Sequence, residues 1–234
     1  TAEKTGTDTA SEGGMTFGVT YWIESDFFKT VADSITKAAE AEGNKTVVVD
    51  AQQDSTKQLQ VVEDFIAQDV DAVFLNPVDK DAIEPALQKL DEAGIPVVNF
   101  DSAVGNLDLV DAYVATDNIQ AGKLCGEAML KDFPDGGKIA VLNYPANSAC
   151  VDREKGFLET IEGKGFEIVE TFDAEGTVEK GQNITSDILQ AHPDLDAIFS
   201  INDQAGMGAY AACMTSGADV AIYGVDGAPE AKQV

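Results

Sequence analysis

The sequence predicts an α/β protein made of two doubly wound, Rossmann-like parallel sheets, each covered by helices on both faces. Short runs rich in Val, Ile and Ala alternate with amphipathic segments at a spacing of about 25 to 30 residues, as in strand–helix–strand units. The alternation is interrupted once, between residues 101 and 110, and then starts again. These observations indicate two lobes of about 100 residues each, an ordinary size for a domain.

The expected strands are short and apolar, without the clean alternation of a strand that faces water on one side. The segments between most of them carry apolar residues three and four positions apart, such as Leu59 and Val62, and are expected to be helices. Gly43, Gly94 and Gly163 stand where left-handed helix caps are expected. The nine expected strands are residues 15–21, 45–50, 71–76, 95–100, 111–116, 138–144, 166–172, 196–201 and 219–225.

The changeover between the lobes is expected near Thr116–Asn118. No crossover helix fits into the interrupting segment "DSAVGNLDLV", whereas "NIQAGKLCGEAMLKDF" is a clear helix that opens the second series. We therefore place the N-terminal lobe at residues 15–117 and the C-terminal lobe at 118–234. The first 14 residues are small and polar and form a flexible N-terminal linker, either a tether to an anchor or a disordered end.

Charge and composition exclude several classes of protein. The net charge of −27 opposes binding to phosphate backbones and anionic lipids, so nucleic acid is not an expected partner. No apolar run approaches the roughly 20 residues that span a bilayer. Cys125, Cys150 and Cys213 match no zinc or redox spacing and are expected to be small buried side chains, with one disulfide and a leftover thiol as the alternative.

Polar side chains follow nearly every expected strand. Ligands of open α/β sheets bind beyond the carboxyl ends of the strands, where amides, carboxylates and hydroxyls exchange hydrogen bonds with hydroxyl groups. Any one of these residues alone is explained as well by a helix cap or a turn. Their repetition indicates a polar, uncharged ligand, and the aromatic residues between Tyr21 and Phe28 would offer a sugar an apolar surface. The polar residues are Asp50, Gln52, Gln53, Asn76, Asp79, Asp101, Ser102, Thr116, Asp117, Asn118, Tyr144, Asn147, Asp173, Asn202, Asp203, Gln204 and Asp226.

Arg153 is the only arginine among 15 basic residues. It falls in the first turns of the helix expected after strand 138–144. Its planar fork of donors can hold two ligand oxygens, and the alternative is an ion pair on the helix surface. We favour contact with the ligand.

The motifs of common enzymes are missing. There is no Walker loop, no GxGxxG and no GxSxG, and "GMGAY" at 206–210 lacks the third glycine and lies in an expected helix. The single histidine, His192, stands at a helix-to-strand corner away from the strand ends. We therefore expect a non-enzymatic protein with no cofactor, and nothing in the sequence specifies a metal site.

Seven motifs in order resemble those of the periplasmic sugar-binding proteins of ABC transporters, ribose-binding type. These are type I periplasmic binding proteins, which share their fold with the effector domains of LacI-like repressors. The similarity runs from about residue 15 to residue 230 and implies two similar lobes, joined by a hinge, that close on a sugar. The motifs are "SDFF" 25–28, "LNPVDKDAI" 75–83, "AGIPVVNFDS" 93–102, "VATDNIQAG" 114–122, "DREKGF" 152–157, "SINDQAGMGA" 200–209 and "GVDGAPE" 224–230.

The resemblance also implies roles for matching positions. Phe27 and Phe28 would sandwich the sugar ring, and Arg153 would be a paired donor from the second lobe. Thr116 and Asp117 would form the first hinge crossing. The implied polar contacts are Ser25, Asn76, Asp101, Asn202 and Asp226.

Departures from the family pattern concern the identity of the sugar. Ribose binders typically carry Arg where Ser102 stands, and the segment 173–178 lacks an aromatic expected from the second lobe. Tyr21 and Trp22 replace small residues and are expected to fill the space; Tyr21 and Ser102 are kept as ligand contacts. The chain ends before the family's other hinge crossings, so we expect the C-terminal part of the family fold to be missing.

The resemblance implies an extracytoplasmic solute-binding protein that binds ribose or a related monosaccharide between the lobes and passes it to a membrane permease. We expect a monomer in the periplasm or outside the cell, with lipid anchoring as a further expectation. The alternatives are a ligand-sensing module of a receptor, or a binder of a polyol or a signalling furanose.

Overall fold

The computed structural model describes residues 13–233, so residues 1–12 of the expected linker lie outside the described part. The chain divides into two compact units. Within the described residues the first unit comprises 13–78, 82–99 and 106–112, and the second comprises 79–81, 100–105 and 113–233. Three short segments before residue 118, namely 79–81, 100–105 and 113–117, are grouped with the second unit. The lobe boundary expected between residues 117 and 118 therefore stays a prediction.

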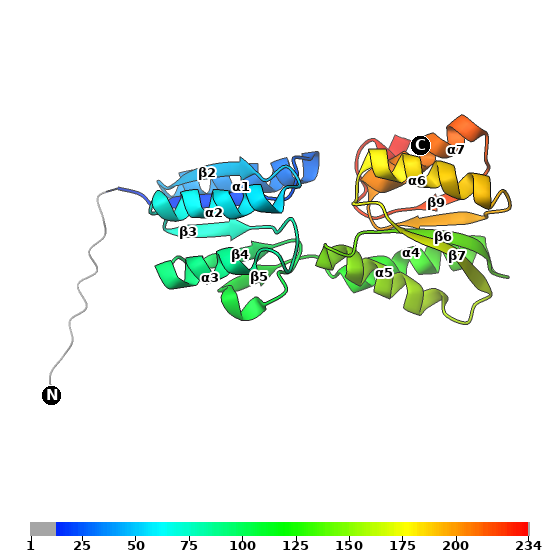
Figure 1. The fold of residues 1–234 in the computed structure, drawn as a ribbon, viewed down its shortest axis with the longest axis horizontal. Helices are drawn as coiled ribbons and strands as arrows, with labels where there is room; N and C mark the ends of the chain where they lie inside the picture. The colour runs from blue at the N-terminus through cyan, green and yellow to red at the C-terminus, as the bar shows by residue number, and fades with distance from the viewer. Residues whose placement is uncertain (1–12, 234) are drawn as a thin grey trace. The chain divides into compact units, whose positions relative to one another are not determined.

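The first unit is built on a parallel sheet of five strands in the order β2-β1-β3-β4-β5. Helix α1 leads from β1 to its neighbour on one side, and α2 and α3 lead toward the other side, so the helices cover both faces (Figure 1). The elements are β1 (Thr16–Tyr21), α1 (Asp26–Ala41), β2 (Lys45–Asp50), α2 (Ser55–Ala67), β3 (Ala72–Leu75), α3 (Glu84–Ala93), β4 (Val97–Phe100), a 3-10 turn η1 (Leu107–Leu109) and β5 (Ala112–Val114).

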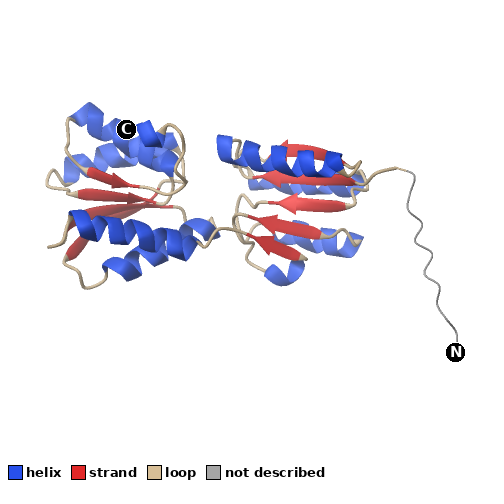
Figure 2. Ribbon diagram, turned by 180° about the vertical axis from the view of Figure 1, so that it is seen from behind, coloured by secondary structure: helices blue, strands red, loops and turns tan. Residues whose placement is uncertain are grey.

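The second unit repeats this winding with four parallel strands in the order β7-β6-β8-β9. Helices α4 and α5 pack on one face of the sheet, and α6 and α7 pack on the other (Figure 2). The elements are α4 (Asn118–Asp132), β6 (Gly137–Asn143), α5 (Ser148–Ile161), β7 (Phe166–Asp173), α6 (Val178–Ala191), β8 (Ala197–Ser200), α7 (Asp203–Ser216), β9 (Ala221–Tyr223) and a 3-10 turn η2 (Ala231–Gln233).

The expected doubly wound architecture is confirmed, with a strand at each of the nine expected places. The interval between β4 and β5 holds only η1, as its length and composition predict. Gly43, Gly94 and Gly163 have φ values of 80°, 68° and 69°, the left-handed conformation expected of them. Several strands are shorter than predicted, because polar residues at their predicted ends, such as Asn76 and Thr116, lie outside the sheet.

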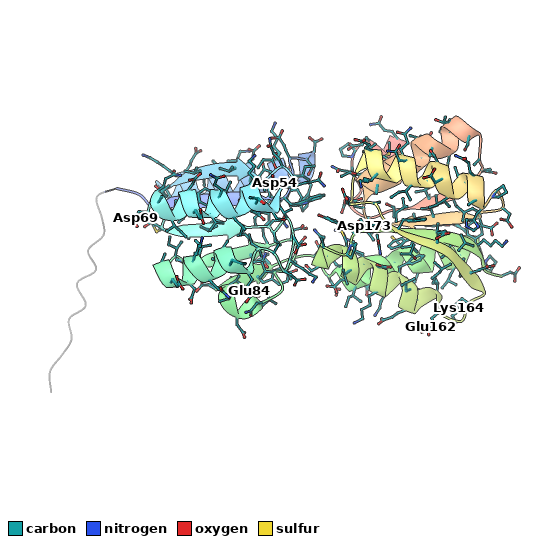
Figure 3. All side chains as sticks on the ribbon, viewed as in Figure 1. Asp54, Asp69, Glu84, Glu162, Lys164 and Asp173 are labelled. Atoms are coloured by element: carbon teal, nitrogen blue, oxygen red, sulfur yellow. The ribbon has the colours of Figure 1, made fainter. Side chains whose placement is uncertain are left out.

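Side-chain carboxylates stabilise the starts of two helices in the first unit. Asp54, labelled in Figure 3, accepts a hydrogen bond from the backbone N of Lys57 at 3.0 Å, which satisfies a donor in the first turn of α2. Glu84, also labelled there, lies in the first turn of α3, where its charge complements the helix dipole. The cap at Asp54 begins α2 close to the carboxyl end of β2, whereas α3 has no side-chain cap.

Both units have close-packed cores. In the second unit, the rings of Phe157 and Phe199 stack at 4.0 Å between centroids and are fully buried. The three cysteines are free thiols, with Cys150 and Cys213 buried, so the expected disulfide alternative is not realised in the described chain. Burial raises the pKa of the Cys150 thiol to about 12, as for an inert apolar side chain. Within residues 13–233, no helix is both long and apolar enough to cross a bilayer.

Candidate functional site

The strand order places a topological switch point in each unit. In the first unit the chain leaves β1 and β3 toward opposite sides of the sheet, and in the second it leaves β6 and β8 in the same way. Loops that diverge at the carboxyl ends of such strands leave a crevice where ligands bind. The residues that follow these four strands are therefore the first candidates for a binding site.

Arg153 is buried at the switch point of the second unit, on the second turn of α5. It is 8% exposed, so it does not form the ion pair on the helix surface that the alternative interpretation required. Its Nε donates to Asn118 Oδ1 at 2.9 Å and its Nη1 donates to the carbonyl oxygen of Ile201 at 2.9 Å. Nη1 also lies 3.0 Å from Oδ1 of Asp226. Among the described residues Nη2 has no hydrogen-bond partner, and this nitrogen is free to meet a ligand oxygen.

Asp226 follows β9 and faces Arg153. Burial raises the pKa of its carboxyl to about 6; Arg153 and the backbone of Asp203 lower it, whereas the carboxylates of Asp203 and Asp101 raise it. The backbone N of Ala228 donates to Asp203 Oδ2 at 2.6 Å, which ties the loop that carries Asp226 to the start of α7. The two predicted residues Arg153 and Asp226 are thus brought together as a pair, in which the donor is buried and the acceptor is partly exposed.

The aromatic residues after β1 form a cluster. The rings of Tyr21 and Phe28 stack at 5.7 Å between centroids, and Trp22 and Phe27 meet Phe28 edge-on at 6.2 and 5.0 Å. Tyr21 and Phe28 are 5% exposed, whereas Phe27 is 53% exposed. One face of Phe28 is therefore taken by Tyr21, and Phe27 is the ring of this cluster that is open to a ligand. The roles expected for Tyr21 and Phe28 as ligand contacts stay predictions.

Asn76 follows β3 at the same switch point. It is fully buried, and its Oδ1 accepts from the backbone N of Trp22 at 3.4 Å. Gln58 of α2 bridges this loop, because its Nε2 donates to Asn76 O and its Oε1 accepts from Val78 N, both at 2.8 Å. Asn76 thus fixes the backbone at Trp22, and its expected contact with a ligand stays a prediction.

Ser25 and Asn202 are helix caps, the alternative considered for strand-end residues. Ser25 Oγ accepts from the backbone N of Phe28 at 3.3 Å at the start of α1. Asn202 Oδ1 accepts from Ala205 N at 3.0 Å, and its Nδ2 donates to Gly176 O at 2.9 Å. Capping does not use up their hydrogen-bonding groups, so both remain candidates for ligand contact.

Asp101 and Ser102 follow β4. Asp101 has a φ of 62°, a conformation that residues other than glycine rarely adopt, and its carbonyl oxygen accepts from Tyr113 Oη at 3.0 Å. Ser102 is fully buried and its Oγ donates to Asp101 Oδ2 at 3.1 Å, so it orients that carboxylate. The strained backbone at a strand end is typical of binding sites.

The two expected hinge residues precede α4. Asp117 caps the helix by accepting from Gln120 N at 2.9 Å, and Thr116 O accepts from Asn118 Nδ2 at 3.1 Å. Hinge motion itself stays a prediction. His192 caps the end of α6, at the opposite end of the sheet from these loops, with Nε2 at 3.7 Å from Glu170 Oε1.

Sequence reasoning gave no role in the site to Gln58, and it named Asn118 and Asp203 only among the polar residues that follow strands. Gln58 stands on the apolar stripe of α2, one turn before Val61 and Val62, and a lone amide on such a stripe is the signal that marks a buried bridge. Asn118 and Asp203 follow strand ends, and their contacts depend on tertiary packing that no local pattern encodes.

A cavity of about 410 Å³ lies beside the loop that carries Asp226. Asp203, Gly224 and Gly227 line it together with Met207 and Tyr210 of α7, but Arg153 and Asp226 do not. It is therefore separate from the polar pair. Within residues 13–233, no group of three or more His, Cys, Asp or Glu side chains is placed to hold a metal ion.

Sequence comparison links these features to known proteins. Residues 17–234 match the family described as "Periplasmic binding protein domain". The ribose import binding protein of Bacillus subtilis (strain 168) is 35% identical over 210 residues, which cover 89% of this chain and 68% of that protein. The ribose import binding protein of Salmonella typhimurium is 32% identical over 213 residues, covering 90% and 72%.

Solved structures give the same result for the fold. A solute-binding protein of an ABC transporter from Bacillus halodurans C-125, with bound myo-inositol, has a TM-score of 0.88 at 29% identity, covering 96% of this chain and 80% of that one. The binding protein of the arabinose ABC transporter from Shewanella sp. ANA-3, bound to α- and β-L-arabinofuranose, has a TM-score of 0.84 at 29% identity, covering 92% and 75%.

Proposed function

Because the chain belongs to the periplasmic binding protein family, we propose that it binds a monosaccharide, ribose or a related furanose, and delivers it to the permease of an ABC transporter. The family consists of non-enzymatic solute-binding proteins, so binding and release are the whole chemistry. The protein works outside the cytoplasm, as a monomer, and we further propose that a lipid anchor holds it at the cell surface.

The observation that carries the proposal is the geometry of Arg153. Arg153 is 8% exposed, and its guanidinium, held on Nε and Nη1, would present Nη2 to a ligand at the carboxyl ends of the strands. Asp226 adds a carboxylate acceptor beside it. A neighbouring donor and acceptor match vicinal hydroxyls of a sugar, each of which both donates and accepts.

The remaining contacts would come from the other strand ends. Phe27 would pack on the C–H face of the sugar ring, since its ring is half-exposed beside the buried Phe28. A ligand held by residues of both lobes would stabilise a closed form through a hinge at Thr116 and Asp117. The proposed polar contacts are Ser25, Asn76, Asp101, Ser102, Arg153, Asn202 and Asp226, with Tyr21, Phe27 and Phe28 as the aromatic contacts.

The ligand class has two candidates. Two relatives are ribose import binding proteins and a structural neighbour holds arabinofuranose, which favours a pentose in its furanose form. Another neighbour holds myo-inositol, which favours a cyclic polyol. Ser102, where ribose binders typically carry Arg, leaves room for either.

A thermal-shift screen of the protein against pentoses, hexoses, cyclic polyols and a nucleoside control tests the proposal. A ligand at 100 times its dissociation constant stabilises the native state by about 2.7 kcal/mol, a readily measured shift. We expect stabilisation by a pentose. A shift with inositol alone would select the polyol, and no shift with any sugar or polyol would contradict the proposed function and favour the sensing module of a receptor.

A further inference from the structure

Three of the hydrogen-bonding directions of Arg153 are already used inside the second unit. The carbonyl oxygen of Ile201 and the carboxylate of Asp226 both approach Nη1, at 2.9 and 3.0 Å. These two contacts alone would allow the guanidinium plane to rotate about its Nη1 end. The contact from Nε to Asn118 Oδ1, at 2.9 Å on the opposite edge, fixes the plane, because two separated attachment points define its orientation.

Close packing of α4 against α5 brings Asn118 within hydrogen-bonding distance of Arg153. A Cβ added to Gly122 of α4 would lie 1.9 Å from the carbonyl oxygen of Arg153, and a Cβ added to Gly156 of α5 would lie 2.0 Å from that of Ile119. The two glycines therefore allow the helix backbones to touch. The short amide of Asn118, at the start of α4, then spans the distance to Nε of Arg153.

Asn118 is itself held in place. It is 5% exposed, and its Nδ2 donates to the carbonyl oxygen of Thr116 at 3.1 Å. Asp117 caps the same helix turn through Gln120 N. The Oδ1 atom of Asn118 is thus oriented toward Arg153 before any ligand binds, because the Nδ2 bond determines which way the amide points.

We propose that Asn118 is a positioning residue that sets the plane of the Arg153 guanidinium, so that Nη2 faces the ligand. This inference deepens the proposed function, on which it rests, and it assigns to Asn118 no contact with the sugar. Replacement of Asn118 by Ala would leave Arg153 held by its contacts with Ile201 and Asp226. Its guanidinium plane would be free to turn, so Nη2 would no longer be directed at the ligand.

A double-mutant cycle tests whether Asn118 acts through Arg153. Titration calorimetry with D-ribose, and with L-arabinose as a second probe, gives dissociation constants for the wild type, Asn118→Ala, Arg153→Lys and the double variant. We expect Asn118→Ala to raise the dissociation constant about tenfold in the wild type, and by less than about twofold when Arg153 is Lys, because Lys has no Nε. The same factor in both backgrounds would overturn the proposal.

Two matched variants separate positioning from folding. Gln120→Ala, an exposed side chain on the same helix turn, is expected to leave the dissociation constant unchanged. Asn118→Asp retains an oxygen acceptor for Nε, and we expect it to bind within about threefold of the wild type. If Asn118→Asp binds as weakly as Asn118→Ala, the acceptor is not what matters and the proposal fails.

A readout without sugar keeps this test independent of the proposed function. Arg153 is the only arginine, so the chain gives one Arg Nε–Hε cross-peak in a ¹⁵N–¹H spectrum. We expect the Hε proton to exchange slowly with water in the wild type and rapidly in Asn118→Ala, with Gln120→Ala unchanged. An unaltered peak in Asn118→Ala would overturn the proposal even if sugars bind. If no sugar binds the wild type, the proposed function fails while this spectrum still decides the role of Asn118.

Discussion

Oδ1 of Asp226 lies 3.0 Å from Nη1 of Arg153. The backbone of Asp226 has a φ of 115°, a value that is rare for any residue but glycine. Such strain persists only where the surrounding structure enforces it. Here the hydrogen bond from Ala228 N to Asp203 and the ion pair with Arg153 hold the loop on both sides. The carboxylate is therefore fixed beside Arg153, where we propose that it accepts a hydrogen bond from a ligand hydroxyl.

Arg153→Ala is expected to weaken sugar binding at least tenfold, since loss of a hydrogen bond to a charged group costs about 1.5–3 kcal/mol. It also leaves the Asp226 carboxylate without its cation. Titration calorimetry with the sugar selected by the thermal-shift screen measures the effect. Lys155→Ala, an exposed cation on the same helix, is the control, and equal affinity of Arg153→Ala and the wild type would remove Arg153 from the site.

The affinity for sugar should fall as the pH drops through about 6, the raised pKa of Asp226. The ionised carboxylate is the better acceptor, and protonation removes it. Titrations between pH 8 and pH 5 check this, and Asp226→Asn should flatten the profile. A wild-type profile that matches that of Asp226→Asn would contradict the assignment.

The stability of the folded protein should depend on pH in the opposite direction to the affinity for sugar, because the protonated form of the same carboxyl group favours the folded state. The folded-state pKa of Asp226 lies above its ordinary value of 3.8, so the folded protein binds this proton more tightly than the unfolded chain does. The contribution of Asp226 to stability is therefore fully present below pH 3.8 and is lost as the pH rises through about 6. Urea unfolding at pH 5 and pH 7.5 checks this. The loss of stability between these two pH values should be smaller for Asp226→Asn than for the wild type.

Phe27 and Phe28 should separate binding from folding. Phe27 is 53% exposed, so Phe27→Ala should weaken sugar binding about five- to tenfold, the worth of one aromatic contact, with little loss of stability. Phe28 is buried against Tyr21 and Trp22, and Phe28→Ala should destabilise the protein by about 3–5 kcal/mol. Calorimetric titration and thermal unfolding measure the two effects, and unchanged affinity of Phe27→Ala would exclude Phe27 from the site.

Gly122→Ala should destabilise the second unit by about 1–3 kcal/mol or more, because the new Cβ would lie 1.9 Å from the carbonyl oxygen of Arg153 and must push α5 away. Gly206→Ala is the matched control in α7, where the nearest atom to a new Cβ is 3.5 Å away. It should be neutral or stabilise by up to about 1 kcal/mol through helix propensity. Urea unfolding compares them, and equal stabilities would refute the close approach of α4 and α5.

His192→Ala should leave sugar binding intact, because the helix end that carries His192 lies at the amino ends of the strands. Its side chain meets Glu170 of β7 and none of the proposed contacts. The same calorimetric titration measures this variant. A large loss of affinity would put the binding site on the other side of the sheet.

The strands, the helices and the strand-end location of the polar residues were predictable, because hydrophobic periodicity and glycine caps are local signals. The pairing of Arg153 with Asp226 was not predictable from local pattern, since 72 residues lie between them in the sequence. Their contact depends on β9 lying beside β8 in the sheet. The resemblance to the family supplied the expectation that both contact one ligand.

The burial of Phe28 shows the same limit. Sequence places four aromatic residues between Tyr21 and Phe28 but does not say which rings pack on one another. The helical turn after Ser25 directs Phe28 inward onto Tyr21 and leaves Phe27 outside. Which aromatic residue is open to a ligand is thus decided by the side-chain directions of α1 and not by composition.

Trp22 is the only tryptophan of the chain, and it lies buried in the first unit, edge-on to Phe28. Its fluorescence is therefore an optical label of one half of the molecule, whereas circular dichroism records the helices of both halves. If the two signals are lost at different denaturant concentrations, the two units unfold separately. A single midpoint would then describe neither of them, and each would have its own unfolding curve.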